Sequence, residues 1–373
     1  MKRLIALLCA ILALTAGAKA VDVSAPSALL MEKETGTVLF AKDEHTQREP
    51  ASVTKVMTLL LAMEAIDSGQ LSYDTMVTAS AHACSMGGSQ IWLKENEQMT
   101  VDEMLKAVCV VSANDCAVAL AEAVCGSEEA FVERMNQRAR ELGMNDTTFQ
   151  NATGLPAPGH VTSAHDIALM SRELVLHHPE IRRYTTIWMD TLRGGESQLV
   201  NTNKLVRFYQ GATGLKTGST DNALYCLSAT AERDGMELIA VIMKGATSPQ
   251  RFEDAQTLLN YGFAGYTLVK IVPETPLAPV PVALGTQATV QPVLGDGGSL
   301  LLEKSKAAGL QQTVTLAESA EAPVVPGTPL GTLTVAAGDE VVAEIPLLAG
   351  EEVPRITFWQ MFLRTLRMAF LAD

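Results

Sequence analysis

Ser52 and Lys55 stand three positions apart at the start of a predicted helix. Pro50 precedes them and favours the first turn of a helix. Residues at i and i+3 share one helix face, so the Ser52 hydroxyl and the Lys55 amine can meet. Residues 56–63 (VMTLLLAM) contain no charge, which predicts a helix that is apolar on all sides and buried. Burial disfavours a charged amine, so the pKa of Lys55 should fall toward that of a usable base.

The same helix start offers half of an oxyanion hole. The backbone N–H of Ser52 lies in the first turn, where it has no helical partner and carries the positive end of the helix dipole. Such a donor can stabilise the negative oxygen of a tetrahedral intermediate. The pattern therefore predicts a serine nucleophile with Lys55 as its general base. A purely structural serine and lysine would give the same local pattern. Other motifs in the chain are therefore needed to distinguish a catalytic from a structural role.

The serine–lysine pair is the first of three short polar motifs. The second lies at a break between two predicted helices, and the third stands at the end of a predicted strand. They read Ser52-Val53-Thr54-Lys55, Ser112-Ala113-Asn114 and Lys216-Thr217-Gly218. Each motif alone is weak evidence. In this order, on a helix start, a helix break and a strand end, they indicate one active site.

The trio resembles that of the low-molecular-weight penicillin-binding proteins, specifically the serine D-alanyl-D-alanine carboxypeptidases. Other stretches that fit this family are residues 149–156 (FQNATGLP), Asn203, Gly214-Leu215, Ser248-Pro249 and Arg251-Phe252. The resemblance covers residues of about 25–265 densely and the C-terminal part more loosely. It implies an α+β fold of the β-lactamase-like transpeptidase type, with an antiparallel sheet flanked by helices and an added helical region.

The resemblance also implies a catalytic role for three residues. Ser52 would attack the carbonyl of the D-Ala-D-Ala bond and become acylated, and Lys55 would take the hydroxyl proton. Ser112 would relay that proton to the departing amine of the terminal D-Ala. The alternative interpretation of Ser112 is a helix cap. The implied partners are peptidoglycan stem peptides ending in D-Ala-D-Ala, with β-lactams as inhibitors.

Substrate binding would fall to the remaining motif residues. Asn114 would hold a substrate amide, and Lys216 and Thr217 would meet the free C-terminal carboxylate. Gly218 would let the peptide pair with the strand edge, and the N–H of Ser219 would complete the oxyanion hole. A solvated strand lysine is the alternative interpretation of Lys216. The histidines and cysteines are scattered, so the sequence predicts no metal site. The serine–lysine mechanism implied by the resemblance needs no cofactor.

The N-terminus predicts export. Residues 1–20 combine a basic start, a short apolar run and an A-x-A end, which is typical of a signal peptide cleaved after Ala20. The net charge is −14, and the removed segment holds Lys2, Arg3 and Lys19 without an acidic residue, so the mature chain carries −17. Such a charge excludes general binding of nucleic acid. Five cysteines remain, an odd number, and buried free thiols are expected.

The sequence predicts three structural parts after the signal peptide. Residues 21–270 should form the catalytic domain, with a hairpin at 28–40, helices at 128–142, 163–177 and 249–261, and a meander of strands between 212 and 243. Prolines crowd the entry to residues 271–351, whose short Val/Thr/Leu runs predict a small all-β domain. Residues 352–373 should form a separate amphipathic helix.

That last helix is expected to lie on a membrane. Over residues 356–371, aromatic and leucine side chains share one arc, and Gln360, Arg364 and Arg367 lie on the other side. The segment is too short and too polar to cross a bilayer, whereas apolar bulk opposite a basic strip suits the membrane interface. The enzyme would then sit at the outer face of the cytoplasmic membrane. An ordinary amphipathic helix packed on protein is the alternative.

Three other functions would use parts of the same sequence pattern. A β-lactamase needs a carboxylate to activate water, but residues 196–201 (ESQLVN) are one residue out of the Glu-x-x-Leu-Asn pattern and lie too close to Lys216. An endopeptidase or transpeptidase of the same family would share the acylation machinery and stays open. A non-catalytic peptidoglycan-binding or β-lactam-sensing protein is disfavoured by the complete set of serines and lysines.

Overall fold

A computed structural model describes residues 21–295 and 298–370 of the 373-residue chain. The predicted signal peptide, residues 1–20, lies outside this description. The chain forms two compact units. The boundary between them in the sequence falls between Gly262 and Phe263, inside a helix. Each unit is described by itself.

The first unit is built on an antiparallel sheet, as predicted, and this sheet has five strands. Its spatial order is β2-β1-β9-β8-β7, so β7 forms one edge. The predicted hairpin supplies two strands and the predicted meander supplies three. They are β1 (Ser27–Glu32), β2 (Val38–Lys42), β7 (Ala212–Thr220), β8 (Leu224–Arg233) and β9 (Met236–Gly245).

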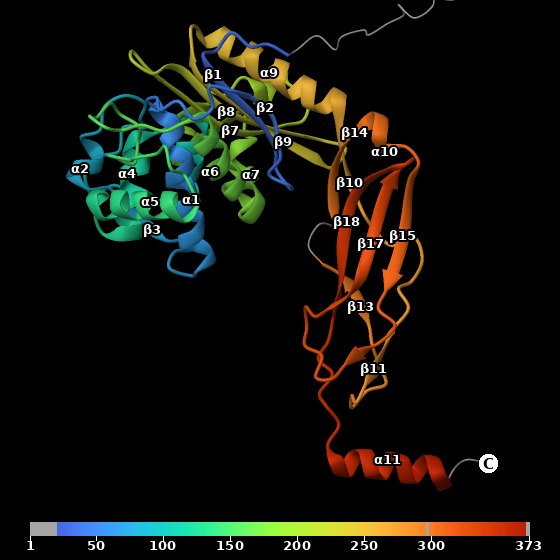
Figure 1. Ribbon diagram of the computed structural model, residues 1–373. Coiled ribbons are helices and arrows are strands. Elements are labelled where there is room, and N and C mark those ends of the chain that lie inside the picture. Colours follow the sequence, from blue (N-terminus) through green and yellow to red (C-terminus); the bar gives the residue numbers. More distant parts are fainter. Residues whose placement is uncertain (1–20, 296–297, 371–373) are drawn as a thin grey trace, which may run out of the picture. The chain divides into compact units, whose positions relative to one another are not determined.

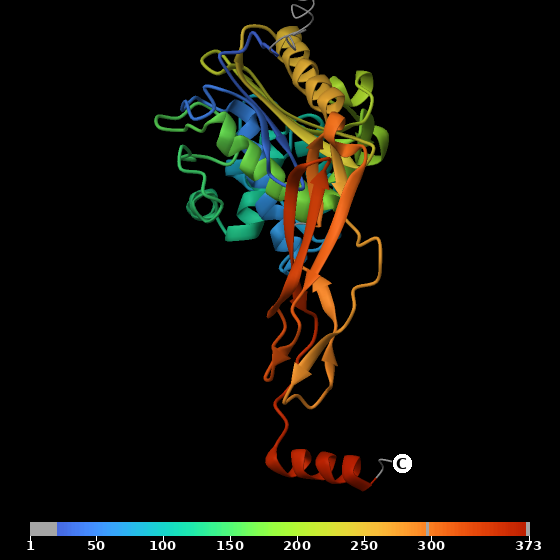
Figure 2. The ribbon, with the colours of Figure 1, turned by 45° about the vertical axis from the view of Figure 1, so that its right-hand side comes forward.

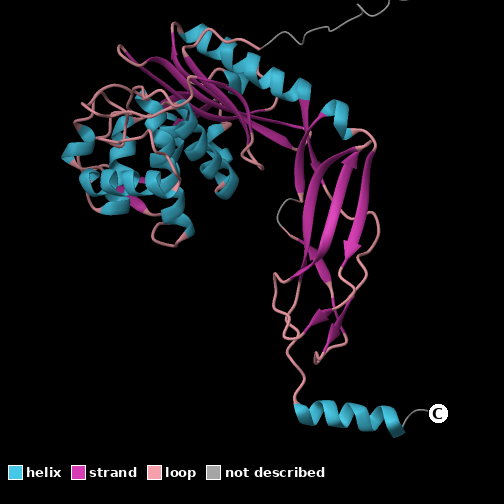
Figure 3. Cartoon of the chain, viewed as in Figure 1, coloured by secondary structure: helices cyan, strands magenta, loops and turns pink. Residues whose placement is uncertain are grey.

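Helices cover both faces of this sheet, which is why its inner strands are mainly apolar. On one face, α6 (Ala164–His177) contacts β1 and β9. On the other face lies α9 (Ser248–Gly265), so close that a Cβ atom on Gly262 would come within 2.5 Å of Leu238 and 3.0 Å of Leu30. Figures 1 and 3 show α9 on one side of the sheet and the other long helices gathered on the opposite side.

A helical region on the α6 side surrounds α1 (Lys55–Asp67), which contacts α3 (Val101–Val110), α4 (Asn114–Cys125), α5 (Glu128–Glu141) and α6. Residues 56–63 of α1 are all buried, as their uncharged sequence predicted. A capping box begins α3, since Thr100 and Glu103 bond each other's backbone N–H groups. The shorter elements are β3 (Met76–Thr78), α2 (Ala81–Cys84), β4 (Gln98–Thr100), α7 (Arg182–Thr185), β5 (Met189–Leu192), β6 (Ser197–Val200) and α8 (Leu205–Phe208).

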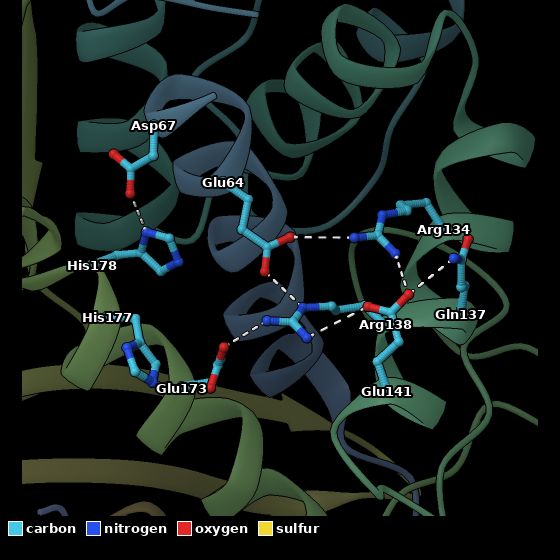
Figure 4. A network of polar contacts seen from close by, with 9 residues as sticks. All are labelled: Glu64, Asp67, Arg134, Gln137, Arg138, Glu141, Glu173, His177 and His178. Carbon is cyan, nitrogen blue, oxygen red and sulfur yellow. Dashed lines mark hydrogen bonds and ion pairs between the residues drawn. The ribbon is translucent and has the colours of Figure 1, made fainter. Parts of the chain in front are cut away.

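One arginine ties three of these helices together. Arg138 on α5 places its guanidinium between Glu64 of α1, at 2.7 Å, and Glu173 of α6. Figure 4 shows this network continuing to Arg134 and Glu141. All three side chains of the central contact are largely shielded from water, where ion pairs are less screened. The network fixes α1 near its C-terminal end, while its N-terminal end carries the predicted nucleophile.

Two local details differ from the sequence prediction. The α-helix begins at Lys55, and residues Ala51–Thr54 form a single 3-10 turn (η1) in front of it. The cause is Ala51, whose φ of 48° lies in the left-handed region and cannot continue a regular helix. The second motif was placed at a break between two helices, but its last residue, Asn114, is already the first residue of α4.

The second unit is predominantly β-structure, as predicted, with a four-stranded sheet of order β13-β18-β17-β15. In Figures 1 and 2 its three long strands run side by side. Since β10 pairs with β14, it joins this unit. The elements are β10 (Tyr266–Lys270), β11 (Val280–Ala283), β12 (Thr289–Val290), β13 (Pro292–Leu294), β14 (Ser299–Glu303), α10 (Lys304–Ala307), β15 (Leu310–Leu316), β16 (Ala320–Glu321), β17 (Pro329–Ala337), β18 (Glu340–Ala349) and α11 (Phe358–Phe370).

The final helix, α11, falls within the predicted segment 356–371, whose last residue lies outside the described part. Its side chains are exposed over residues 358–365. Among the described residues, no helix combines the length and the apolar character that crossing a membrane requires.

Candidate active site

The predicted nucleophile and base lie within hydrogen-bonding distance. Ser52 in η1 is half-buried, and its Oγ is 3.0 Å from Nζ of Lys55, at the first position of α1. The amine also donates to the carbonyl of Thr153, at 2.7 Å. This second contact fixes the lysine side chain and leaves it directed at the serine hydroxyl. The i, i+3 spacing therefore has the geometric consequence that the sequence predicted.

Lys55 is fully buried, which disfavours the protonated form of its amine. Burial lowers the pKa of its amine well below the usual range, and the nearby charge of Lys216 lowers it further. Asp115 acts in the opposite direction and only partly offsets these effects. A lowered pKa enlarges the fraction of amine that carries a free lone pair, and such an amine can accept the Ser52 proton.

The loop that receives the lysine is pressed against the nucleophile turn. Gly154 has φ +83°, and a Cβ atom there would lie 1.9 Å from the carbonyl oxygen of Ala51. Only glycine permits this approach. A hydrogen bond to α1 also fixes this loop: the Thr58 hydroxyl donates to the carbonyl of Ala152 at 2.6 Å. Residues 152–154 thereby pack against the turn that carries Ser52 and bind the Lys55 amine.

Ser112 does not cap the following helix. The residue at the N-cap of α4 is Ala113, which makes no side-chain cap bond. Ser112 is buried with φ 64°, a strained conformation for a non-glycine residue, and its Oγ has no hydrogen-bond partner among the described residues. Strained residues and unpaired buried polar atoms concentrate at functional sites. The structure thus supports the relay interpretation over the cap.

Asn114 presents an unused acceptor. Its Nδ2 donates to the carbonyl of Gly87 at 2.6 Å, and its backbone N–H donates to the carbonyl of Ser89 at 2.7 Å. Its Oδ1 is buried without a partner in the described part of the chain. A buried amide oxygen left open is suited to accept an N–H from a bound peptide. The clamp on residues 87–89 holds that oxygen in place.

Lys216 is not the solvated strand lysine that was the alternative interpretation. It is 1% exposed, and its Nζ donates to the carbonyl of Thr217 at 2.9 Å. Burial lowers the pKa of its amine to about 7; Cys109 opposes that shift and Arg251 adds to it. The hydroxyl of Thr217 lies 2.7 Å from that of Thr202. A lysine poised near neutrality gains its proton when a substrate carboxylate arrives.

Gly218 brings the strand edge to the nucleophile. A Cβ atom at this position would lie 2.8 Å from the carbonyl oxygen of Pro50 and 2.9 Å from the backbone nitrogen of Ser52. The edge strand β7 therefore passes directly beside the helix start. Ser219, the next residue, is exposed. The first and third motifs, far apart in sequence, meet through this close contact.

Arg251 is a site residue to which the sequence analysis gave no role. It projects from α9, is 6% exposed, and donates from Nη1 to the carbonyls of Gly218, at 3.0 Å, and Cys226, at 3.2 Å. Burial lowers the pKa of its guanidinium to about 10, so it remains charged at neutral pH. It supports β7 from behind and adds a positive charge near Lys216. The sequence offered two signals for this residue: Arg251-Phe252 fits the family, and it lies shortly after the last strand of the meander.

His160 lies beneath the nucleophile turn and was also missed. Its Nδ1 accepts from the backbone N–H of Gln150 at 3.2 Å, which leaves the proton on Nε2. That nitrogen donates to Oγ1 of Thr54 at 2.8 Å. Burial lowers the pKa of His160 to about 4, so the ring is neutral at working pH. It orients the residue between Ser52 and Lys55.

Comparison with known proteins agrees with this geometry. The family described as D-alanyl-D-alanine carboxypeptidase matches residues 14–247, more than half of the chain. The chain belongs to that family. The carboxypeptidase is accordingly a serine-type hydrolase, and the predicted family and fold are confirmed. A second family, the penicillin-binding protein 5 C-terminal domain, matches residues 266–355.

Individual relatives cover almost the whole enzyme. D-alanyl-D-alanine carboxypeptidase DacF of Bacillus subtilis is 40% identical over 347 residues, which is 92% of this chain and 89% of that protein. Penicillin-binding protein 5 from Haemophilus influenzae is similar in structure, with a TM-score of 0.78 and 28% identity over 90% of this chain and 98% of that one. The carboxypeptidase therefore shares both its catalytic domain and its β domain with these proteins.

Proposed function

We propose that the enzyme removes the terminal D-Ala from peptidoglycan pentapeptides through an acyl-enzyme on Ser52. The observation that carries this proposal is the 3.0 Å contact between Ser52 Oγ and the buried Nζ of Lys55. A neutral amine at that distance can take the hydroxyl proton as the oxygen attacks the carbonyl of D-Ala-D-Ala. The C–N bond then breaks, and the departing amine needs a proton, which Ser112 relays.

The binding residues complete this scheme. Lys216 and Thr217 hold the free carboxylate of the terminal D-Ala, and Asn114 accepts an N–H from the peptide. The N–H groups of Ser52 and Ser219 stabilise the oxyanion, each donor lowering the barrier by ~3 kcal/mol. Water hydrolyses the ester and regenerates the Ser52 hydroxyl.

The same nucleophile should react with β-lactams. A similar protein, penicillin-binding protein D2 from Listeria monocytogenes, is known in an ampicillin-bound and a cefotaxime-bound form; it is 33% identical to this chain, with a TM-score of 0.60. A β-lactam carries a carboxylate near its reactive amide carbonyl, as the D-Ala-D-Ala terminus does. We expect Ser52 to open the ring and to remain acylated, with Lys216 binding the carboxylate.

The test of the reaction is release of free D-Ala from a monomeric pentapeptide ending in D-Ala-D-Ala. Stoichiometric or faster release without an added acceptor amine supports the carboxypeptidase. Release that depends on an acceptor would indicate a transpeptidase, and cleavage only of cross-linked muropeptides would indicate an endopeptidase. A protein that releases no D-Ala and forms no adduct with labelled penicillin would be a non-catalytic binding protein.

We further propose that the mature enzyme is exported and held at the outer face of the cytoplasmic membrane by α11. Support comes from its exposed aromatic residues: Phe358 and Trp359 are 72% and 70% exposed, and Phe362 is 48% exposed. Arg364 on the same helix adds a positive charge suited to anionic lipid heads. At this position the enzyme would reach newly made peptidoglycan.

A further inference from the structure

The proposed reaction assigns no step to Asp115, the residue directly after Asn114 in α4. Its side chain is fully buried. A buried charge is costly unless it is paired or hydrogen-bonded, and this carboxylate accepts three backbone N–H groups. The donors are Ile91 at 3.1 Å, Leu93 at 3.0 Å and Cys116 at 2.9 Å. Two of these bonds join α4 to a loop that is more than 20 residues away in the sequence.

The two bonds to the loop flank a strained residue. Trp92, between Ile91 and Leu93, has φ 61°, and its side chain is 73% exposed, whereas both neighbours are buried. The left-handed region is unfavourable for a bulky residue, and such a conformation persists only where the surrounding structure holds it. The Asp115 carboxylate therefore maintains a loop conformation that the Trp92 backbone does not favour by itself.

The same loop holds Asn114. The Nδ2 of Asn114 donates to the carbonyl of Gly87 at 2.6 Å, and its backbone N–H donates to the carbonyl of Ser89 at 2.7 Å. Asn114 and Asp115 thus bind one loop at two points. Since Oδ1 of Asn114 is the buried acceptor left open in the described site, its direction depends on where this loop lies.

The charge of Asp115 also acts on the base. Burial and the charge of Lys216 lower the pKa of Lys55, and the Asp115 carboxylate raises it. The other titratable groups that this carboxylate affects are Cys84, Cys116 and Arg193. Burial raises the pKa of both thiols, and an ion pair raises the pKa of the guanidinium, so these three groups do not titrate near neutral pH. Loss of the Asp115 charge should therefore change the pH profile through Lys55.

We infer that Asp115 is a positioning residue of the active site: its carboxylate fixes the loop of residues 87–93 and, through this loop, the direction of Asn114 Oδ1. The inference rests on the proposed function, because it concerns the group that accepts an N–H from the bound peptide. Asp115 needs no contact with the substrate for this role. An amide in its place would turn a donor toward one of the backbone N–H groups that the carboxylate now accepts.

The experiment separates the charge of this carboxylate from its position, in the full mature enzyme. In Asp115→Asn, kcat/KM for a pentapeptide ending in D-Ala-D-Ala should fall about tenfold or more, since a misplacement of about 1 Å can cost about 10²-fold. The acid limb of its pH profile should move to lower pH, because the charge that raises the pKa of Lys55 is gone. Asp115→Glu keeps the charge but displaces the carboxylate, so kcat/KM should fall while the acid limb stays nearer to the native one.

Asp254→Asn is the matched control. Asp254 on α9 is also buried, and its carboxylate accepts the backbone N–H groups of Ser24 and Ala25 at 2.9 Å each, but it makes no bond to the loop of residues 87–93. We expect near-native kcat/KM and an unchanged acid limb. Trp92→Gly supplies a second background, because glycine adopts φ 61° without strain. In that background Asp115→Asn should cost less than in the native chain, which a double-mutant cycle measures.

The outcomes distinguish the role of Asp115 from the reaction itself. Near-native kcat/KM in Asp115→Asn, an equal loss in the Trp92→Gly background, or a loss without the shift of the acid limb overturns the inference while the carboxypeptidase stands. A native enzyme that releases no D-Ala overturns the proposed reaction. The rate of acylation by benzylpenicillin, whose side-chain amide offers an N–H, then decides about Asp115 in the same variants. If Asp115→Asn does not fold, the comparison is made between Trp92→Gly and the double variant.

Discussion

The charge of Lys216 disfavours protonation of Lys55. Both amines are buried, and the lowered pKa of Lys55 has burial as its first cause and Lys216 as its second. The two lysines therefore divide the chemistry: one is a base that must lack a proton, and the other is a cation that must keep one to hold a carboxylate.

The catalytic pair is tested by removing each member. Ser52→Ala should abolish both D-Ala release and covalent labelling by penicillin, because Ser52 carries the hydroxyl that Lys55 Nζ contacts. Lys55→Ala should slow acylation by about 10²–10⁴-fold, the usual contribution of a general base. Lys216 should not rescue it, since its amine donates to Thr217. Mass spectrometry and D-Ala release provide the measurements, and labelling of Ser52→Ala would refute the assignment.

The two lysines predict a bell-shaped pH profile of kcat/KM. At low pH the activity falls because Lys55 becomes protonated. As pH rises through about 7, Lys216 loses its proton and free-carboxylate substrates bind less well. A peptide with an amidated C-terminus should lack this alkaline loss, and Lys216→Ala should weaken turnover of the free acid more than that of the amide. Rates at roughly pH 5 to 10 check this. Equal alkaline losses for acid and amide would contradict the carboxylate role.

Gly218 predicts a steric effect. A methyl group there would meet Pro50 and the backbone of Ser52 at 2.8–2.9 Å, so Gly218→Ala must move β7 away from the helix start. We expect a loss of about 1–3 kcal/mol in the free energy of unfolding, as for overpacking elsewhere, together with slower acylation. Gly265→Ala is the matched control, because nothing lies within 4 Å of its added methyl group. Thermal unfolding and penicillin acylation rates compare the two variants. Equal rates would show that the close approach is not needed.

Local patterns explain what could be predicted from the sequence. The i, i+3 contact of Ser52 and Lys55, the capping box at Thr100 and the strands of the meander all depend on neighbours in the chain, so spacing alone reveals them. The relay interpretation of Ser112 required the structure, because only there is its hydroxyl buried and unpaired. The left-handed turn at Ala51 left no mark in the residue types.

Contacts between distant segments could not be predicted in this way. The Lys55 amine bonds the carbonyl of Thr153, and Arg251 bonds the carbonyl of Gly218. Each contact joins residues on separate elements, and a carbonyl partner is independent of side-chain identity. The burial of Lys216 could not be predicted from the sequence either. Lysine side chains are mostly exposed, so the residue type favoured a solvated position.

The membrane proposal concerns α11, and the structure shows where to cut. Val353 is fully buried and pairs with Val324 through two backbone hydrogen bonds, so the β domain extends past residue 352. Deletion of residues 358–373 removes the helix but keeps this contact. We expect this truncated enzyme to bind anionic vesicles at least about tenfold more weakly than the full mature chain, because its exposed aromatic residues are gone.

The site residues named above all precede the end of the first unit at Gly262. Release of soluble D-Ala should therefore be nearly unchanged in the truncated enzyme. A full-length variant with Phe358→Ser and Trp359→Ser is the matched control. It keeps the chain length and the arginines but loses the two most exposed aromatic side chains among residues 358–366 of α11. Co-sedimentation with phosphatidylglycerol vesicles and D-Ala release are measured on the same preparations. If the truncated enzyme sediments as fully as the mature chain, α11 is not the anchor; if only the double variant does, the arginines and remaining apolar residues suffice for binding.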